Sequence, residues 1–461
     1  MNNLNEKCAV FGIYGEKEGN AARQTFFGLF ALQHRGQEQS GIVSTDGKKL
    51  FSHKGAGLVS HIFNEKIIDK LKGSSAIGHN RYSTSHGTDS KHAQPVCISN
   101  KIAFAHNGNL PSVEALISFL KKNKISTKDN SDSELMAKAI GVYMKKGMSL
   151  PEAVSEAYPL FTGAFSCVAL STSELVAFRD PRGIRPLVIG KKGKEVVIAS
   201  ETCALRTVGA ELFREVLPGE MIIVSKNGIK SKILDKADPK FDIFEFVYFS
   251  RPDCIILDRS VYQVRKNFGK ILYKENPNIK VDVIIPVPET ALPAAIGYSQ
   301  VAKVPFEMAL NKSRYIHRTF IEPSQKSREQ KVKMKISVLR SIVKDKKVGI
   351  MDDSVVRGTT SRQIVKMLFE AGAKEVHFMV SSAPVKFPDF YGIDTPNQSK
   401  LVAFNKTNKE ICEFLGATTL SYLSIDGMVE ATGLPKERFC LSAFNGEYPL
   451  PIFEHEKEVK Y

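Results

Sequence analysis

The sequence predicts two halves of different fold class, a strand-rich α+β sandwich flanked by helices and then an α/β domain built on a parallel sheet. In the first half, short runs rich in β-branched and aromatic residues alternate with turn signals, which is typical of strands. After about residue 240, apolar strands alternate with helical patterns, which is typical of βαβ units. A polar, lysine-rich stretch, Ser225–Phe241, is the expected boundary.

In the first half, each expected strand is a short apolar run between turn residues. These runs are Ala9–Ile13, Gly41–Ser44, Ala76–Gly78, Ile102–Ala105, Phe165–Ala169, Leu175–Phe178, Leu187–Ile189, Val196–Ala199 and Glu220–Val224. The expected helices have amphipathic spacing, and Asp132 and Ser149 serve as caps for the last two. They are Ala21–Leu32, Val113–Lys121, Ser133–Met144 and Pro151–Ala157.

In the second half, longer apolar strands are separated by helices of ten or so residues, as parallel pairing requires. The strands are Val281–Pro286, Lys347–Met351 and Glu375–Val380, and the helices are Gln263–Glu275, Leu292–Val301, Thr360–Ala371 and Asn408–Leu415. The charged C-terminal segment, Phe453–Tyr461, is expected to be frayed.

Composition excludes several protein classes. The 461 residues are 43% hydrophobic and 25% charged, which is ordinary for a globular chain of two or three domains. No run of about 18 apolar residues predicts a membrane span, and the N-terminus has no secretory signal pattern. Seven scattered cysteines without a C-x-x-C pair argue against a disulfide framework and favour a reducing cytoplasm.

The formal net charge of +16 permits two interpretations. A basic protein can bind nucleic acid, but here the lysines are spread along the chain and Trp is absent. A solubilising surface that also suits a small polyanionic substrate is therefore preferred, and no nucleic acid or membrane partner is expected. The stretch Lys326–Lys347 is locally dense in Lys and Arg and is predicted to form a basic flap over a diphosphate.

The segment Val348–Ser361 carries the strongest chemical signal. A short apolar run ends in Asp352 and Asp353, and a small polar loop then leads into a helix. Loop N–H groups and a helix N-terminus suit a phosphate, whereas paired carboxylates suit ribose hydroxyls or hydrated Mg²⁺. One ligand with a phosphate, a diol and a metal-bound diphosphate fits both. The segment resembles the phosphoribosyl-diphosphate loop of type I phosphoribosyltransferases.

In the first half, Cys8 leads an expected strand and is followed by four polar motifs. These are His34–Gly41, Gly78–Thr84, Ala105–Leu110 and Ser131–Glu134. In this order they resemble the class II glutamine amidotransferases, N-terminal-nucleophile hydrolases that release ammonia from glutamine. The resemblance implies an αββα sandwich. His34, His79 and His106 are expected to be structural.

The same resemblance implies a role for Cys8 as the nucleophile. Its thiolate would attack the glutamine side-chain amide, and its free α-amine would be the general base after removal of a propeptide, residues 1–7. An unperturbed α-amine has a pKa of about 7.7–8.0, which suits that task. The chain departs from the family pattern at Ala9, where Gly is usual, and at Lys7, where propeptides often end in Glu.

The other glutaminase roles also follow from the resemblance. The Asn107 side chain and the Gly108 N–H would form the oxyanion hole. Arg81 would bind the α-carboxylate of glutamine, and Asp132 would bind its α-ammonium.

Glutaminase motifs followed by a phosphoribosyl-diphosphate loop resemble one family, the amidophosphoribosyltransferases. Further stretches support this resemblance over almost the whole chain: Arg179–Leu187, Ala199–Cys203, Phe244–Asp253, Arg318–Pro323 and Phe390–Asp394. It implies a glutaminase domain over residues 8–240 and a phosphoribosyltransferase domain over residues 241–461. Glutamine, phosphoribosyl diphosphate and water would give 5-phosphoribosylamine, glutamate and diphosphate, the first step of purine synthesis.

In the second domain, the resemblance implies one Mg²⁺ per subunit, held at Asp352, Asp353 and Thr290. Lys335 would reach the diphosphate. The loop would surround the 5-phosphate through Ser354, Arg357, Gly358, Thr359 and Thr360. The family also implies a homotetramer or homodimer and inhibition by purine nucleotides.

Two rival functions remain open at this point. A class II amidotransferase feeding a sugar isomerase or an aspartate adenylation site would lack the Asp352–Asp353 loop. A regulator that only senses phosphoribosyl diphosphate would have no use for Cys8 and Asn107. Glutaminase activity stimulated by phosphoribosyl diphosphate discriminates among them.

One branch of the family carries a [4Fe–4S] cluster on four cysteines. The corresponding positions here are Asp242, Asp389, Cys440 and Ala443, so no cluster is expected. Cys440 is then predicted to be a buried structural residue, with the two aspartates holding the segment by hydrogen bonds.

Overall fold

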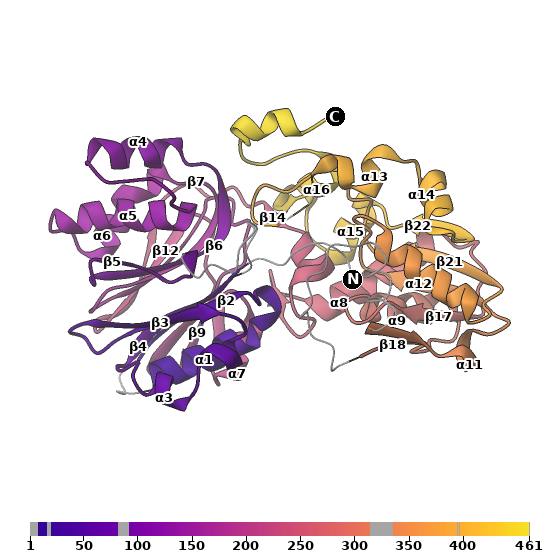
Figure 1. The fold of residues 1–461 in the computed structure, drawn as a ribbon, viewed down its shortest axis with the longest axis horizontal. Coiled ribbons are helices and arrows are strands. Elements are labelled where there is room, and N and C mark those ends of the chain that lie inside the picture. The colour runs from indigo at the N-terminus through magenta and orange to yellow at the C-terminus, as the bar shows by residue number, and fades with distance from the viewer. Residues whose placement is uncertain are drawn as a thin grey trace.

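The computed structural model describes residues 8–15, 20–81, 92–313, 335–393, 395 and 397–460. The first half is a sandwich of two antiparallel sheets (Figure 1). The first sheet has the order β11 (Glu211–Glu215), β9 (Val188–Lys192), β10 (Glu195–Ala199), β1 (Ala9–Tyr14), β4 (Ser75–Arg81), β2 (Gln39–Thr45) and β3 (Leu50–Ala56). The second has the order β13 (Gly228–Ile233), β12 (Glu220–Ser225), β8 (Leu175–Arg179), β7 (Thr162–Leu170), β6 (Ile102–Ser112) and β5 (Val96–Ile98).

Helices cover the outer face of each sheet, which gives the predicted αββα layers (Figure 1). Alternate strand residues supply the core between the sheets, among them Val10, Ile77 and Val168. Against the first sheet pack α1 (Ala21–Ala31) and α7 (Thr202–Thr207), near the short α2 (Val59–Ile62) and α3 (Glu65–Ile68). Against the second pack α4 (Glu114–Lys122), α5 (Asp132–Lys145) and α6 (Leu150–Ala157).

Two local expectations for this half are corrected. The polar stretch Ser225–Phe241 is not a plain linker, because β13 within it pairs along β12. Its alternating Lys and Ser face solvent at a sheet edge, so it lacks the apolar run that predicts a strand. The helix α5 is capped by Ser131 in a capping box with Glu134, and Asp132 is its first residue.

The second half is built on a parallel sheet of order β17 (Val283–Pro286), β20 (Lys347–Asp352), β21 (Glu375–Val380) and β22 (Thr419–Tyr422). This confirms the predicted α/β class, although β22 was not foreseen. The helices α8 (Val261–Glu275) and α9 (Leu292–Ala302) cover one face, and α12 (Thr359–Glu370) and α14 (Asn408–Leu415) cover the other. Neighbouring residues Ile284 and Ile285 enter cores on opposite faces, as the strand pleat requires.

Smaller elements complete the second half. Two short ribbons are formed by β15 (Ile255–Ile256) with β16 (Arg259–Ser260) and by β18 (Leu310–Lys312) with β19 (Ile336–Val338). The remaining helices include α11 (Arg340–Val343), α13 (Val402–Asn405), α15 (Ile425–Thr432) and α16 (Ser442–Asn445). Among the described residues, no helix has the length and apolar content needed to cross a bilayer.

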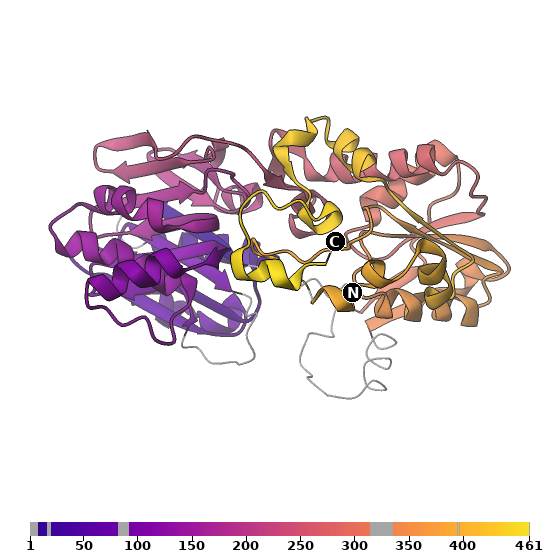
Figure 2. The same ribbon diagram turned by 90° about the horizontal axis from the view of Figure 1, so that it is seen from above.

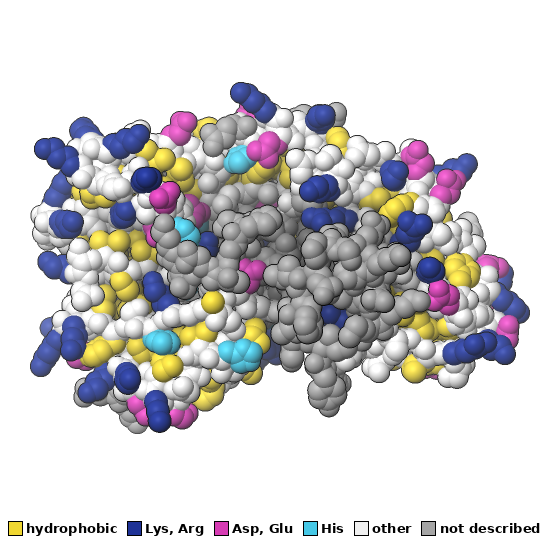
Figure 3. Space-filling model, in the orientation of Figure 1, with side chains coloured by type: hydrophobic (Ala, Val, Ile, Leu, Met, Phe, Trp, Pro, Cys, Tyr) yellow, Lys and Arg dark blue, Asp and Glu magenta, His cyan; other side chains and the backbone are white. Residues whose placement is uncertain are grey.

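The two halves lie side by side, and one apolar cluster runs through both (Figure 2). It includes Leu29 of α1, Phe246 of the π-helix η4 (Glu245–Phe249) and Phe268 of α8. The parallel pair β14 (Phe241–Asp242) and β23 (Phe439–Cys440) ties the end of the chain to the start of the second half. On the visible face, Lys and Arg are scattered and not gathered on one element (Figure 3).

The expectation of a frayed C-terminal segment is wrong. A 3₁₀ helix, η7 (Phe453–Glu458), is anchored on both sides, because Ile452 and Val459 are buried with Phe390 and Ala164. The Gln398 side chain also holds the backbone of Lys460 by two hydrogen bonds of 2.9 and 2.7 Å. The anchoring residues are too few and too widely spaced to be recognised in a charged segment.

The anchor predicts a stability effect. The substitution Ile452→Ala should lower the free energy of unfolding by about 2–5 kcal/mol, because it leaves a cavity in a packed cluster. Leu339→Ala, at a side chain that is 43% exposed, should cost less than about 0.5 kcal/mol. Urea unfolding followed by circular dichroism measures both. Equal midpoints for the two variants would mean that the segment is not anchored.

Candidate active site

Cys8 and Arg81 are brought together by strand register. In the antiparallel pair of β1 and β4, Ala9 lies opposite Asn80, so the residues one step further, Cys8 and Arg81, lie at the same end of the two strands. Arg81 is half-buried, and its Nη1 donates to the carbonyl of His92 at 2.7 Å. Its guanidinium is therefore fixed in direction, with donors left for a ligand.

Asn107 and Gly108 lie on β6 in the facing sheet. The Asn107 side chain is fully buried, and neither its amide nitrogen nor its oxygen has a hydrogen-bond partner among the residues that the structure describes. A buried amide without partners costs free energy unless a ligand completes its hydrogen bonds. Gly108 has φ of +147°, and a Cβ there would lie 2.0 Å from the Ala164 carbonyl oxygen. Only glycine fits, so its backbone N–H can be presented without a side chain in the way.

Asp132 approaches the same strand from the start of α5. Its Oδ2 accepts from the Leu110 N–H at 3.3 Å and lies 3.7 Å from His106 Nδ1. His79 of β4 lies between the sheets, and its Nε2 donates to the His106 carbonyl at 3.0 Å. Burial lowers the pKa of His79 to about 3, so its ring is neutral at pH 7. These contacts agree with the expectation that both histidines are structural.

Arg35 links Cys8 to the second half of the chain. It is 2% exposed, and its Nε donates to the Cys8 carbonyl at 3.3 Å. Its other nitrogens form a bidentate pair with Glu245 at 2.6 and 2.8 Å and a 2.6 Å contact with Glu201. Burial alone would raise the pKa of Glu245, but the adjacent Arg35 charge lowers it overall. The pair is therefore ionised.

Arg185 extends this ion network toward the C-terminus. It contacts Glu245 at 3.3 Å, Asp242 at 3.1 Å and Asp389 at 3.7 Å, and its Nε donates to the Tyr391 carbonyl. Burial raises the pKa of Asp242 to about 7 against the lowering effect of Arg185.

The four positions at which the resemblance would place cluster ligands lie around this network. Asp242 pairs with Cys440 in the β14–β23 ribbon, and Cys440 is buried as predicted. The aspartates do hold the segment by hydrogen bonds. Asp242 accepts from the Phe244 N–H at 2.9 Å, and Asp389 accepts from the N–H groups of Tyr391 and Ile393 at 2.9 and 2.7 Å.

A second group of acidic and hydroxyl side chains lies at the carboxyl edge of the parallel sheet. Strands β17 and β20 are neighbours, with Pro286 opposite Met351, so the segments that follow them meet. Thr290 Oγ1 donates to Asp353 Oδ2, and Ser354 Oγ donates to Asp353 Oδ1. Burial, followed by the Asp353 charge, raises the pKa of Asp352 to about 8. Two buried carboxylates side by side favour a cation between or beside them.

The loop after these acids has the geometry of an anion site. Gly358 has φ of +70° and precedes α12, which begins at Thr359, one residue earlier than predicted. A Cβ at Gly358 would lie 3.0 Å from the Phe414 ring. Thr359 is exposed and Thr360 half-buried in the first turn, where the helix itself supplies no acceptor for the backbone N–H groups. Within the described part of the chain, the buried Arg357 Nε has no hydrogen-bond partner.

Lys335 lies just before β19, and its carbonyl accepts from the Ser313 N–H at 2.8 Å. Its contact with a diphosphate stays a prediction. Several expected features fall outside the described residues: the propeptide 1–7, Tyr82–Thr84, Arg318–Pro323, residues 326–334 of the basic flap, and Asp394.

Two family comparisons match the two halves separately. Residues 79–207 match the glutamine amidotransferase domain, and residues 257–386 match the phosphoribosyl transferase domain. Over its whole length the chain is 42% identical to the amidophosphoribosyltransferase of Bacillus subtilis, with 99% of this chain and 98% of that protein covered. The chain belongs to the amidophosphoribosyltransferase family. It is therefore a pentosyltransferase with a glutamine amidotransferase domain.

Other members of the amidophosphoribosyltransferase family agree. Amidophosphoribosyltransferase 1, chloroplastic, of Arabidopsis thaliana is 44% identical over 96% of this chain and 79% of its own. The solved glutamine phosphoribosylpyrophosphate amidotransferase from B. subtilis, complexed with ADP and GMP, superposes with a TM-score of 0.90 at 42% identity. That match covers 97% of this chain and 98% of the solved one.

Sequence reasoning did not assign a role to the buried ion network. Arg35 and Arg185 lie inside quoted motifs, but a charge in a motif does not reveal which distant carboxylate it meets. Arg265 was missed as well. It is fully buried, donates to the carbonyls of Phe246 and Ser250, and keeps Nη1 without a partner. Burial lowers the pKa of Arg265 to about 10, against the opposing effect of Asp353 and other anions.

The buried neutral His79 predicts a pH dependence of stability. The unfolded chain binds a proton at His79 near pH 6.5, whereas the folded chain does so only near pH 3. The free energy of unfolding should therefore fall as pH decreases through this window, by up to about 1.4 kcal/mol per pH unit. His79→Gln keeps a donor for the His106 carbonyl and should flatten that slope. Urea unfolding across the window is the measurement, and an unchanged slope would contradict a neutral buried imidazole.

Proposed function

We propose that this chain converts glutamine, phosphoribosyl diphosphate and water into 5-phosphoribosylamine, glutamate and diphosphate, the first step of purine synthesis. One observation carries the proposal: full-length identity of 42% to an amidophosphoribosyltransferase spans both a glutaminase half and a phosphoribosyl half. The proposed division is a glutaminase domain over residues 8–240 and a phosphoribosyltransferase domain over residues 241–461. It is supported by the two separate family matches.

In the glutaminase half, the Cys8 thiolate attacks the glutamine amide after residues 1–7 are removed, and the freed α-amine takes and returns the proton. Asn107 and the Gly108 N–H stabilise the oxyanion, a role supported by an amide that is buried without partners. Arg81 holds the α-carboxylate, and Asp132 holds the α-ammonium. The Arg35 contact with the Cys8 carbonyl orients the nucleophile.

In the phosphoribosyl half, ammonia attacks the anomeric carbon and diphosphate leaves. Asp352 and Asp353 orient the ribose hydroxyls, and the loop surrounds the 5-phosphate through Ser354, Arg357, Gly358, Thr359 and Thr360. The position of this loop at the N-terminus of α12 supports the assignment, because a helix N-terminus favours a phosphate. Lys335 neutralises charge that develops on the diphosphate.

The carboxylates of Asp352 and Asp353 and the Thr290 hydroxyl are hard oxygen donors, which fit Mg²⁺. When bound, Mg²⁺ would neutralise diphosphate charge. The cluster positions offer one sulfur, Cys440, together with two ion-paired aspartates and an alanine, which does not fit a [4Fe–4S] cluster. The proposed enzyme is therefore free of that cluster.

Ammonia would pass between the halves within the protein. Support comes from contacts that join them close to the nucleophile: Asn109 Nδ2 donates to the Phe390 carbonyl at 2.8 Å, and Arg35 pairs with Glu245. We further propose a homotetramer or homodimer inhibited by purine nucleotides, since a relative was solved with ADP and GMP bound. Free cysteines favour a reducing cytoplasm.

The nucleophile is tested by Cys8→Ala. Glutamine-dependent synthesis of phosphoribosylamine should fall by at least about a thousandfold, whereas synthesis from ammonium salts should stay within about twofold, since the second site does not need the thiol. Cys97→Ala, at another half-buried cysteine, is the matched control and should retain both activities. Near-normal use of glutamine by Cys8→Ala would overturn the hydrolase assignment.

The phosphoribosyl site is tested by Asp353→Asn. Turnover with glutamine and with ammonia should fall together, on the order of 100-fold, because both nitrogen donors meet the same anomeric carbon. Asp69→Asn, at an exposed aspartate, should leave both rates unchanged. Normal ammonia-dependent turnover in Asp353→Asn would remove this site from the proposal.

A further inference from the structure

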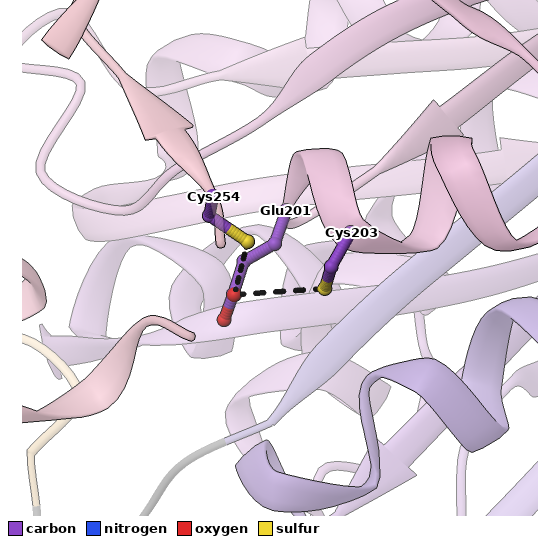
Figure 4. A group of neighbouring side chains, drawn as sticks. All are labelled: Glu201, Cys203 and Cys254. Carbon is purple, nitrogen blue, oxygen red and sulfur yellow. Dashed lines mark hydrogen bonds between the residues drawn. The ribbon is translucent and has the colours of Figure 1, made fainter. Parts of the chain in front are cut away.

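A buried cluster of two thiols and one carboxylate lies where the halves meet. Glu201 and Cys203 lie at the start of α7, and Cys254 precedes the β15–β16 ribbon (Figure 4). All three side chains are 2% exposed or less. Their ligand atoms lie within 4.8 Å of one another, and the mechanism proposed above uses none of the three.

Both sulfurs converge on one oxygen. Glu201 Oε2 is 3.1 Å from Cys254 Sγ and 3.8 Å from Cys203 Sγ (Figure 4). Donors around a tetrahedral Zn²⁺, at about 2.3 Å for sulfur and 2.1 Å for oxygen, are about 3.6–3.8 Å apart. The Cys203–Glu201 distance already matches this spacing, and the Cys254–Glu201 distance would have to lengthen by about 0.5 Å on binding. A disulfide would instead require the sulfurs to approach each other to about 2.05 Å.

Hydrogen bonds from neighbouring side chains orient the Glu201 carboxylate, as is usual for a metal ligand. Glu201 Oε1 accepts from Arg35 at 2.6 Å and His34 Nε2 at 2.8 Å, which leaves Oε2 facing the sulfurs. Besides the thiols, Oε2 accepts from the Arg251 N–H at 3.1 Å. The positive charge of Arg35 is balanced by Glu245, with which it is also paired. The cluster therefore has no excess positive charge that would repel a cation.

The charge balance allows a divalent ion in this buried position. In the protein as it stands, both thiols act as hydrogen-bond donors to Glu201. Binding of M²⁺ displaces two protons, one from each thiol, and forms two M–S bonds and one M–O bond. The two protons carry away two positive charges and the divalent ion adds two, so the net charge of the buried cluster does not change.

We propose that Glu201, Cys203 and Cys254 form a binding site for a borderline-soft divalent cation, with Zn²⁺ as the natural occupant and water as the fourth ligand. Sulfur donors disfavour Mg²⁺ and Ca²⁺, which prefer oxygen. The ion would clamp α7 of the glutaminase half to the first segment of the phosphoribosyl half. It would also lie one carboxylate away from Arg35, which holds the Cys8 carbonyl.

Co²⁺ is the probe, because tetrahedral thiolate coordination gives intense visible bands and a near-ultraviolet charge-transfer band. The full chain, reduced and stripped with a chelator, should bind one equivalent of Co²⁺ with these bands, and Zn²⁺ should remove them. Cys254→Ser and Cys203→Ser should each lose the signal. Cys412→Ser should keep it, and Cys8→Ser should also keep it, which separates this site from the nucleophile.

Further readouts make the test independent of catalysis. One equivalent of Zn²⁺ should raise the melting temperature of the parent protein but not of Cys254→Ser. No saturable Co²⁺ signal, or an equal signal in Cys254→Ser, would overturn the site. Mild oxidation could instead give a mass lower by two hydrogens, a Cys203–Cys254 disulfide in a peptide map and no Co²⁺ binding. That result would overturn the metal site and identify the two cysteines as a redox pair. Ammonia- and glutamine-dependent activities, measured in parallel, report on the proposed function separately.

Discussion

The pairing of Arg35 with Glu245 is the constraint around which the two halves are arranged. Both side chains are buried, and a buried charge without its partner is strongly unfavourable. Separating the two halves would therefore leave an unpaired charge on each of the two contact surfaces. The guanidinium that meets Glu245 also reaches the Cys8 carbonyl at 3.3 Å. The position of Cys8 therefore depends on a residue of the second half.

The same network continues from the first half to the end of the chain. From Glu245, Arg185 leads to Asp242 and Asp389, and from there to the anchored C-terminal segment. Around these charges runs an apolar cluster that contains strands and helices of both halves. Directional ion pairs define the register of the halves, whereas apolar burial supplies most of the favourable free energy. The ion pairs of Arg185 with Asp242 and Asp389 connect β14 to the segment after Pro388.

Much of the fold was predictable because it follows from local pattern. Glu375–Val380 and Asn408–Leu415 have the boundaries expected from their apolar spacing and caps, and Asp352 and Asp353 end a strand as expected. Elements stabilised by long-range contacts were not predictable. The edge strand Gly228–Ile233 has a polar sequence, and the C-terminal segment is ordered only by residues far away in the chain. The local pattern of apolar and polar residues does not indicate which distant residues a segment will contact.

The sequence alone determined the family, the order of the two halves and the residue types at each site, because motifs such as Ala105–Leu110 and Val348–Ser361 are contiguous. Tertiary structure decided what those residues face. It left the Asn107 amide buried without a partner, brought Thr290 to Asp353, and gathered Glu201, Cys203 and Cys254 into one cluster. Such groups form through strand register and packing between segments 50 or more residues apart, information that no short stretch of chain contains.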